Sequence, residues 1–282
     1  MIAVVDYQKG NLKSVVRGLI AAGGEAFITA DASEIAKADA IVLPGVGAFA
    51  DAAATMSELW QMEAIRDRVR AGVPFLGICL GEHLMFEHGV EGAPEGNPAC
   101  GLGLLPGTVV AMPRCDAQGK AFKVPHVGWN TIEMPSCNGG VTVPPCGEGG
   151  GNAVLSSGGA GGGAARSSAA KRGLFEHGAF PGSAPQVGSE LAFPDSTPQP
   201  GSDLAFACPL FDGIAPGEYF YFTHSFIAPT GSHTIAETTH SVRFTSAVQF
   251  GECAFGVQFH PEKSSDAGAR VLANFVAIAA RG

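Results

Sequence analysis

Several features that would indicate other classes of protein are missing from this sequence. Its 17 Lys and Arg are outnumbered by 26 Asp and Glu, which gives a formal net charge of −9, whereas nucleic-acid-binding proteins carry basic patches. No apolar run approaches the roughly 18 residues of a membrane span, and the start at Met1 lacks the charged and long apolar regions of a signal peptide. We therefore expect a cytoplasmic protein that binds neither nucleic acid nor membrane.

Paired cysteine spacing is also missing. The chain has seven cysteines, an odd number, and none of them stands in the CxxC spacing that is typical of zinc sites and of many redox motifs. We therefore expect reduced thiols and no metal. The 282 residues are 46% hydrophobic, which is enough for a sizeable core.

One cysteine lies in a pattern that is typical of a nucleophile elbow. The apolar run Phe75–Ile78 predicts a strand, Gly77–Gly81 reads Gly-x-Cys-x-Gly, and a helical pattern follows. Flanking glycines keep a Cβ from clashing or blocking the approach of a substrate carbonyl. A helix that starts at the second glycine directs unpaired amides and a positive dipole end at the sulfur, which favours the thiolate. We therefore predict that Cys79 is a nucleophile, and we expect Leu84–Phe86 to lie on a buried face of that helix.

The C-terminal part of the chain supplies candidates for a base and for the group that orients it. Phe255–Phe259 predicts a strand, and His260-Pro261-Glu262 follows, where the proline fixes φ and turns the chain. A lone histidine at a strand end is more often structural, but this one accompanies a cysteine elbow. Because a thiol nucleophile needs a base and an orienting group, we predict these roles for His260 and Glu262.

A third segment could stabilise an oxyanion. The apolar run Ala40–Leu43 predicts a buried strand, and Pro44–Phe49 follows it with two glycines, at Gly45 and Gly47. Glycines let backbone amides approach a developing negative charge. Taken alone, the segment fits an ordinary strand-to-helix turn equally well. Together with the other two, it predicts a hydrolase whose parts meet at the carboxyl edge of one sheet.

With these motifs the chain resembles the class I (triad) glutamine amidotransferases, whose signature includes Gly-x-Cys-x-Gly and a late His-Pro-Glu. Within that family it resembles the glutaminase subunits of imidazole glycerol phosphate synthase. The similar segments, in the order of that family, are Asp6–Val15, Leu43–Phe49, Pro125–Asn130, Tyr221–Phe226 and Phe259–Ser265. The first and the fourth are specific to this subunit, and the resemblance covers residues 1 to about 135 and about 208 to 282.

The resemblance implies a two-step hydrolysis of L-glutamine. Cys79 would attack the side-chain carboxamide, His260 would protonate the departing ammonia, and water would then hydrolyse the thioester with His260 as base. Glu262 would orient the imidazole. The ammonia would pass to a cyclase subunit, a (β/α)8 barrel, in a heterodimer of histidine biosynthesis. The resemblance implies no cofactor.

The resemblance also implies binding residues. The oxyanion site and the glutamine pocket would be formed by Gly45, Val46, Gly47, Leu80, His83, Ser225 and Phe226. The surface facing the cyclase subunit would include Asn11, Trp129 and Lys263. Judged alone, a tryptophan is more often buried in a core, and a lysine is more often a solvated surface charge.

One departure from the family pattern affects the pocket. The family usually has glutamine two residues after the second elbow glycine, whereas this chain has Glu82-His83. An imidazole offers fewer hydrogen-bonding atoms than a carboxamide, and Glu82 could alter the charge of His83. Because of His83, a cyclase-binding subunit with impaired glutaminase activity stays open as an alternative. A glutaminase subunit of another amidotransferase also stays open, because it would share Cys79, His260 and Glu262.

The order of elements predicts an α/β fold, and the resemblance implies the flavodoxin-like class I amidotransferase fold. Parallel strands are expected at Ile2–Asp6, Glu25–Ile28, Ala40–Leu43 and Phe75–Ile78. Further strands are expected at Gly107–Met112, Tyr219–Phe226, Thr234–Thr239, Ser246–Phe250 and Phe255–Phe259. Helices are expected after Asn11 and after Ser265 or Asp266, which would cap them.

One segment differs in composition from the rest of the chain. Residues 136–205 are rich in glycine, serine and proline, a composition typical of low-complexity disorder. We expect a single amidotransferase domain over residues 1–282, interrupted by this disordered insertion, because a long surface insertion adds little loop-closure cost. A lid or a partner-binding arm is the alternative.

Overall fold

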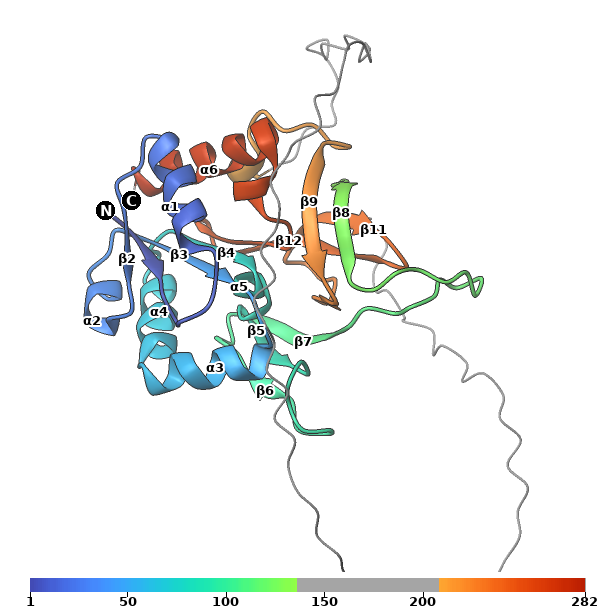
Figure 1. Cartoon of the computed structure of the whole chain (residues 1–282). Coiled ribbons are helices and arrows are strands. Elements are labelled where there is room, and N and C mark those ends of the chain that lie inside the picture. Colours follow the sequence, from blue (N-terminus) through green and yellow to red (C-terminus); the bar gives the residue numbers. More distant parts are fainter. Residues whose placement is uncertain (136–207, 282) are drawn as a thin grey trace, which may run out of the picture. The chain divides into compact units, whose positions relative to one another are not determined.

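The computed structural model describes residues 1–135 and 208–281, all of which belong to one compact unit. The insertion expected at 136–205 lies outside the described residues. Within them, a seven-stranded sheet forms the centre of the fold (Figure 1). Its strands, from one edge to the other, are β11 (Thr234–Thr239), β12 (Arg243–Phe250), β13 (Ala254–Val257), β4 (Phe75–Cys79), β3 (Ala40–Gly45), β1 (Ile2–Val5) and β2 (Ala26–Thr29).

The five strands from β13 to β2 are parallel, and β12 and β11 extend the sheet in antiparallel pairing. Among the parallel strands the order is 2-1-3-4 followed by the last strand, which is the flavodoxin-like order. The expected α/β fold is confirmed. The motif-bearing strands β3, β4 and β13 are direct neighbours, so their carboxyl ends lie side by side.

Helices cover both faces of this sheet, because its strands are apolar on both sides. On one face, α1 (Leu12–Ala21) and α6 (Ser265–Ala279) bury Val15, Leu19, Val271 and Phe275 against alternate residues of the strands. On the other face lie α2 (Ala32–Ile35), α3 (Phe49–Glu58) and α4 (Gln61–Arg70). Figure 1 shows α1 beside α6 and α3 beside α4.

The remaining elements form two small sheets and short helical turns. One sheet has the order β10 (Phe226–Ile227), β7 (Leu105–Ala111), β5 (Phe86–Gly89) and β6 (Ala99–Cys100). The other pairs β8 (His126–Thr131) with β9 (Tyr219–His224). The short turns are α5 (Leu80–His83), η1 (Pro209–Phe211) and η2 (Pro261–Lys263).

The prediction that the helix continues through Leu84–Phe86 is wrong. Helix α5 ends at His83, and strand β5 begins at Phe86. The carbonyls of Leu84 and Met85 accept hydrogen bonds from the amides of Leu102 and Leu104 instead. All three side chains of Leu84–Phe86 are buried, as expected, but in a strand-like connection rather than on a helix.

The predicted helix caps are also wrong. Asn11 occupies the N-cap position of α1, but its side chain makes no capping hydrogen bond. Helix α6 has Ser264 at its N-cap rather than Ser265 or Asp266. The Ser264 hydroxyl donates to the carbonyl of His260 at 2.6 Å and accepts the Tyr221 amide at 3.0 Å. Ser264 therefore ties the loop after β13 to strand β9 instead of capping the helix.

Candidate active site

The three motif segments meet at one edge of the sheet. Gly45 of β3 pairs with Cys79 of β4, and Val257 of β13 pairs with Ile78 of β4. Ligand sites in open parallel sheets lie at the carboxyl ends of the strands. The loops that follow Gly45, Cys79 and Val257 therefore enclose a common space.

Cys79 has the backbone strain of a nucleophile elbow. Its φ is +55° and its ψ is −108°, backbone angles that residues other than glycine rarely adopt. A Cβ at Gly81 would overlap the backbone oxygen of Leu43, and one at Gly77 would meet the backbone of Gly81. Both elbow glycines are therefore required, because the turn packs directly against β3.

Cys79 is 8% exposed, and its sulfur has polar neighbours from two segments of the chain. Its Sγ lies 3.9 Å from the carbonyl oxygen of Thr223, to which the thiol donates. On another side, the side-chain amide of Gln258 donates to Sγ at 3.7 Å. The protonated thiol can thus donate to Thr223, and the thiolate can accept from Gln258.

His260 and Glu262 form the predicted pair. The imidazole Nδ1 lies 2.9 Å from a carboxylate oxygen of Glu262, and both side chains are buried. Burial by itself would lower the pKa of His260, but the adjacent Cys79 and Glu262 outweigh it and raise that pKa to about 9. Among the described residues, the buried Nε2 of His260 makes no hydrogen bond of standard geometry. This nitrogen is therefore available for proton transfer.

A cavity of about 410 Å³ opens onto Cys79 and His260. Of the residues expected to bind glutamine, the ones that line it are Val46, Gly47, Leu80, His83, Ser225 and Phe226. Gly45 lies beneath it, where a Cβ would meet the Tyr7 hydroxyl and the Leu80 side chain. Six of the seven residues thus line the cavity, and Gly45 packs against Tyr7 and Leu80 next to it.

The pair Glu82-His83 is buried behind the sulfur. His83 Nε2 lies 2.6 Å from the side-chain oxygen of Gln258. Burial lowers the pKa of His83 to about 4, against the effect of this hydrogen bond, so the imidazole is neutral at pH 7. Burial also raises the pKa of Glu82 well above its usual range, with a smaller contribution from Cys79. Burial therefore favours the uncharged form of Glu82 beside His83.

The amide of Val46, a predicted oxyanion donor, has a partner within the protein. It donates to the hydroxyl of Tyr7 at 3.2 Å. Tyr7 is fully buried, and this burial raises the pKa of its hydroxyl, which is therefore neutral. A substrate oxygen would have to compete with Tyr7 for this amide.

The residues expected at a partner interface are exposed. Trp129 on β8 is 51% exposed, which corrects the expectation from tryptophan alone that it is buried in the core. It packs edge-on against Tyr221 of β9, over whose ring Lys263 Nζ lies at 5.8 Å. Asn11 is exposed at the start of α1. Trp129, Tyr221 and Lys263 thus form a continuous group on the surface.

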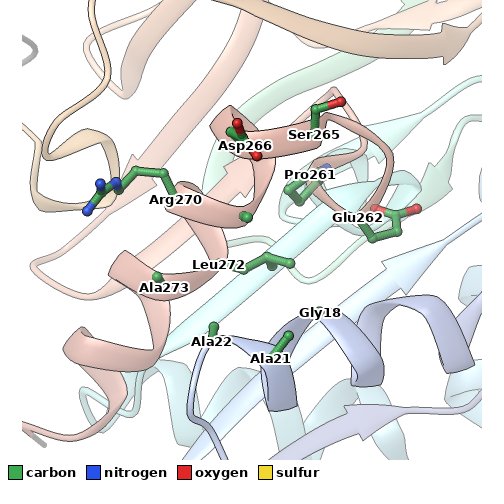
Figure 2. Close-up of a pocket in the computed structure, with 11 residues that line it drawn as sticks. Gly18, Ala21, Ala22, Pro261, Glu262, Ser265, Asp266, Arg270, Leu272 and Ala273 are labelled. Carbon is green, nitrogen blue, oxygen red and sulfur yellow. The ribbon is translucent and has the colours of Figure 1, made fainter.

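A second cavity, of about 460 Å³, lies between α1 and the first half of α6 (Figure 2). Figure 2 shows Leu272 between the two helices, with Gly18, Ala21 and Ala22 on the α1 side. Glu262 reaches its wall, but neither a thiol nor an imidazole lines it. The predicted nucleophile and base therefore line the cavity at Cys79 and not this one.

Several absences hold for the part of the chain that the structure describes. No group of three or more His, Cys, Asp or Glu side chains could hold a metal ion there. No helix within residues 1–135 and 208–281 is long and apolar enough to cross a membrane. Cys79, Cys100, Cys208 and Cys253 are free thiols. Cys115 is disulfide-bonded, which corrects the expectation of a reduced thiol at that position.

Sequence reasoning missed Gln258, Tyr7 and Thr223, which contact site groups. It also missed Glu91 and His224, which line the cavity. Gln258 offered a signal, because it is the one polar residue in the apolar run Phe255–Phe259. The others offered none, because their role depends on segments that are distant in sequence.

Comparison with known proteins agrees with this geometry. A family model described as "Glutamine amidotransferase class-I" matches residues 3–138. The chain is 34% identical to the imidazole glycerol phosphate synthase subunit HisH of Moorella thermoacetica, over 97% of this chain and 93% of that protein. It is also 34% identical to HisH of Rhodopirellula baltica, over 98% and 96% of the two chains.

Two solved structures share the fold at low sequence identity. One is a glutamine amidotransferase, with a TM-score of 0.56, 15% identity, and coverage of 99% of this chain and 100% of that chain. The other is PurLQS from Thermotoga maritima, with a TM-score of 0.54, 14% identity, and coverage of 98% and 97%. These likenesses support the fold alone.

Proposed function

The chain belongs to the HisH family of imidazole glycerol phosphate synthase subunits, and on that basis we propose that it hydrolyses L-glutamine and supplies the ammonia to a cyclase subunit in histidine biosynthesis. The observation that carries the proposal is the meeting of Cys79 with the His260–Glu262 pair at the mouth of one cavity. A strained elbow, a base and its orienting carboxylate are the parts that thiol-based acyl transfer needs.

The first step transfers the γ-glutamyl group to Cys79. The sulfur attacks the carboxamide carbon, and the C–N bond breaks as the imidazolium of His260 protonates the departing nitrogen. The raised pKa of His260, about 9, keeps this proton in place at neutral pH. The products of the step are a thioester, free ammonia and a neutral imidazole.

The second step hydrolyses the thioester. Acylation removes the charge of the sulfur, and with it one of the interactions that raise the pKa of His260. The imidazole is then a better base, and its Nε2 takes a proton from the attacking water while Glu262 stabilises the resulting imidazolium. Glutamate leaves, and the thiolate–imidazolium pair is restored.

The cavity suits an amino acid. Its volume of about 410 Å³ lies in the range of small-ligand sites. We propose that Val46, Gly47 and Leu80 bind the reacting end, and that Ser225 and Phe226 bind the rest. Glu91, which also lines the cavity, supplies a carboxylate for the substrate ammonium group. Since His83 Nε2 is engaged by Gln258, only the other edge of that ring remains for glutamine.

We further propose that the cyclase subunit binds the surface at Trp129, Tyr221, Lys263 and Asn11, in a cytoplasmic heterodimer. A half-exposed tryptophan that packs on a tyrosine beside a lysine is typical of binding hot spots. Strand β9 connects this group to the cavity, because it carries Tyr221 and continues to Thr223 and His224 at the cavity wall.

The decisive experiment compares two ammonia sources. Cys79→Ala should abolish glutamine-dependent turnover by the reconstituted synthase, while turnover with added ammonium salt should stay within about twofold of the wild type. Cys253→Ala is the matched control, since Cys253 lies on the turn before β13 and should leave both activities unchanged. Loss of both activities in Cys79→Ala would show that the residue is structural.

A second experiment separates the alternatives. The proposal predicts that a barrel cyclase and its nucleotide substrate stimulate glutamine hydrolysis, and that the gene rescues a histidine auxotroph. Rescue failure with intact glutaminase activity would indicate another amidotransferase. Cyclase binding without modification of Cys79 by a glutamine-derived diazo-ketone would indicate an impaired glutaminase.

A further inference from the structure

Two polar residues outside the triad are connected to the reacting sulfur. Gln258 is fully buried between β13 and η2, and its side-chain amide donates to Cys79 Sγ at 3.7 Å. The oxygen of the same amide lies 2.6 Å from Nε2 of His83, which is also buried. The three side chains therefore form one chain of hydrogen bonds, His83 to Gln258 to Cys79.

The direction of this chain depends on His83. For the amide to donate to sulfur, its oxygen must face His83, so Nε2 of His83 must carry the proton. If that proton were on Nδ1 instead, Nε2 would accept the amide NH2, and the amide oxygen would turn towards the sulfur. An oxygen there would repel a thiolate. His83 thus determines whether Gln258 favours or opposes ionisation of Cys79.

Donors and acceptors around the sulfur favour different forms of Cys79. The Thr223 carbonyl, at 3.9 Å, can only accept, so it favours the thiol. The NH2 of Gln258 donates, so it favours the thiolate. In a buried site an oriented dipole of this kind acts strongly, because little water screens it.

The charge that faces the sulfur acts beside this hydrogen bond. It is that of His260 with its partner Glu262, and His260 lines the same cavity as Cys79 and is coupled to it. Burial favours the uncharged forms of Glu82, Tyr7 and His83. The remaining titratable side chains that line the cavity are Glu91 and His224.

We propose that Gln258 is a catalytic residue that donates a hydrogen bond to the Cys79 thiolate, and that His83 is a positioning residue that holds the Gln258 amide in the donating orientation. This inference rests on the proposed function, because it assigns the two residues to the glutaminase reaction. It explains why a histidine at position 83 is compatible with an active site. A proton on Nε2 gives the Gln258 oxygen a donor, as an amide NH2 at that position would.

The test measures thiolate formation rather than turnover. The rate of alkylation of the Cys79 peptide by iodoacetamide, followed by mass spectrometry from pH 5 to 10, reports the titration of this thiol alone. Gln258→Met keeps the length of the side chain and removes the donor. We expect the midpoint to rise by about one pH unit and alkylation at pH 7 to fall about tenfold. The full-length protein is used throughout.

Matched variants separate this effect from a structural one. Gln61→Met is the control, because Gln61 is also fully buried, but its amide donates to the carbonyls of Asp6 and Ala30. It should leave the midpoint unchanged. His83→Phe, which leaves the amide without its donor, should raise the midpoint by about half a unit. In contrast to His83→Phe, His83→Gln supplies an NH2 donor to the Gln258 oxygen, so the midpoint should equal the wild-type value.

The possible outcomes are distinct. An unchanged midpoint in folded Gln258→Met overturns the proposal, and so does a shift of equal size in Gln61→Met. If Gln258→Met does not fold, Gln258→Asn retains polarity and withdraws the amide from the sulfur, and the same upward shift is expected. A wild-type protein that alkylates as expected but does not hydrolyse glutamine would overturn the proposed function and leave this test valid.

Discussion

The two sides of the Cys79 sulfur differ in how the sequence encodes them. On one side, His260 and Glu262 are separated by a single proline, and their contact of 2.9 Å is local. On the other side, Gln258 and His83 meet although 175 residues separate them in the chain, and Glu82 lies beside them in the same buried layer. The first side is a motif, and the second is a product of the fold.

The two sides also differ in which polar groups have partners. His260 and Glu262 share a hydrogen bond through Nδ1, and Glu262 helps to raise the pKa of His260, although within the described residues the buried Nε2 of His260 and Oε2 of Glu262 have no partner. Glu82 is fully buried, and within the described residues neither of its carboxyl oxygens has a hydrogen-bond partner. A site tolerates such a cost where it does not disturb the chemistry. The comparison therefore predicts a loss of activity when Glu262 is changed and a gain of stability when Glu82 is replaced by an apolar residue.

The largest expected effect is on the motif side. Glu262→Gln keeps a hydrogen-bond acceptor for His260 but removes the charge that helps to raise the pKa of His260 to about 9. We expect kcat for glutamine to fall by about 10²-fold, with the loss greatest at high pH, where the imidazolium is no longer maintained. Steady-state kinetics from pH 6 to 9 would measure this.

Glu252→Gln is the control for this variant, because it makes the same change at an exposed turn before β13. It should retain wild-type kcat at every pH. A loss in Glu262→Gln that is equal at all pH values would show that Glu262 fixes the position of the imidazole without affecting its protonation.

The sequence predicted the motif side because its signals are local. Strands β1, β3, β4 and β13 read as short apolar runs, since both faces of a parallel sheet are buried. The helical face at Val15 and Leu19 was predictable from the four-residue spacing of its apolar side chains, and both residues are buried. The order of the strands places their motif-bearing ends together, so Cys79, His260 and Glu262 followed from pattern alone.

What could not be predicted depends on pairings between distant segments. Helix α5 ends at His83 because the carbonyls of Leu84 and Met85 accept hydrogen bonds from the amides of Leu102 and Leu104. The local sequence does not predict these distant pairings. Strand β8 contains a glycine and polar residues, and it forms through pairing with β9, about 90 residues later. The contacts of Gln258 and Tyr7 were missed for the same reason.

An effect of intermediate size, on stability rather than activity, is expected at Glu82, which lies on the side of Gln258 and His83. Glu82→Met replaces an unpartnered carboxyl by an apolar side chain of similar length, in a region where Met85 and Val248 already pack. The free energy of unfolding should rise by about 2 kcal/mol at pH 7. Thermal or urea denaturation of the variant and the wild type would measure the change.

The gain should depend on pH in a defined direction. Because the pKa of Glu82 is raised in the folded state, the folded protein holds a proton that the unfolded chain releases above its own pKa near 4.5. The stability of the wild type therefore falls as pH rises above about 4.5, and the advantage of Glu82→Met should grow from pH 5 to 8. Glu82→Gln does not titrate either, so its stability relative to the wild type should grow by the same amount over this pH range.

The smallest expected effect concerns the amide of Val46, which combines a residue of a local motif with a partner that is distant in sequence. Val46 lies in a recognisable motif, but its amide donates to Tyr7, a partner that the fold supplies. Tyr7→Phe removes this competitor and frees the amide for the substrate oxygen, so kcat without the cyclase should rise about twofold. Tyr219→Phe, at a half-exposed tyrosine of β9, is the control. A fall in kcat for Tyr7→Phe would instead mean that the Tyr7 hydroxyl holds the loop in its working position, and that the fold, rather than the motif, forms the oxyanion site.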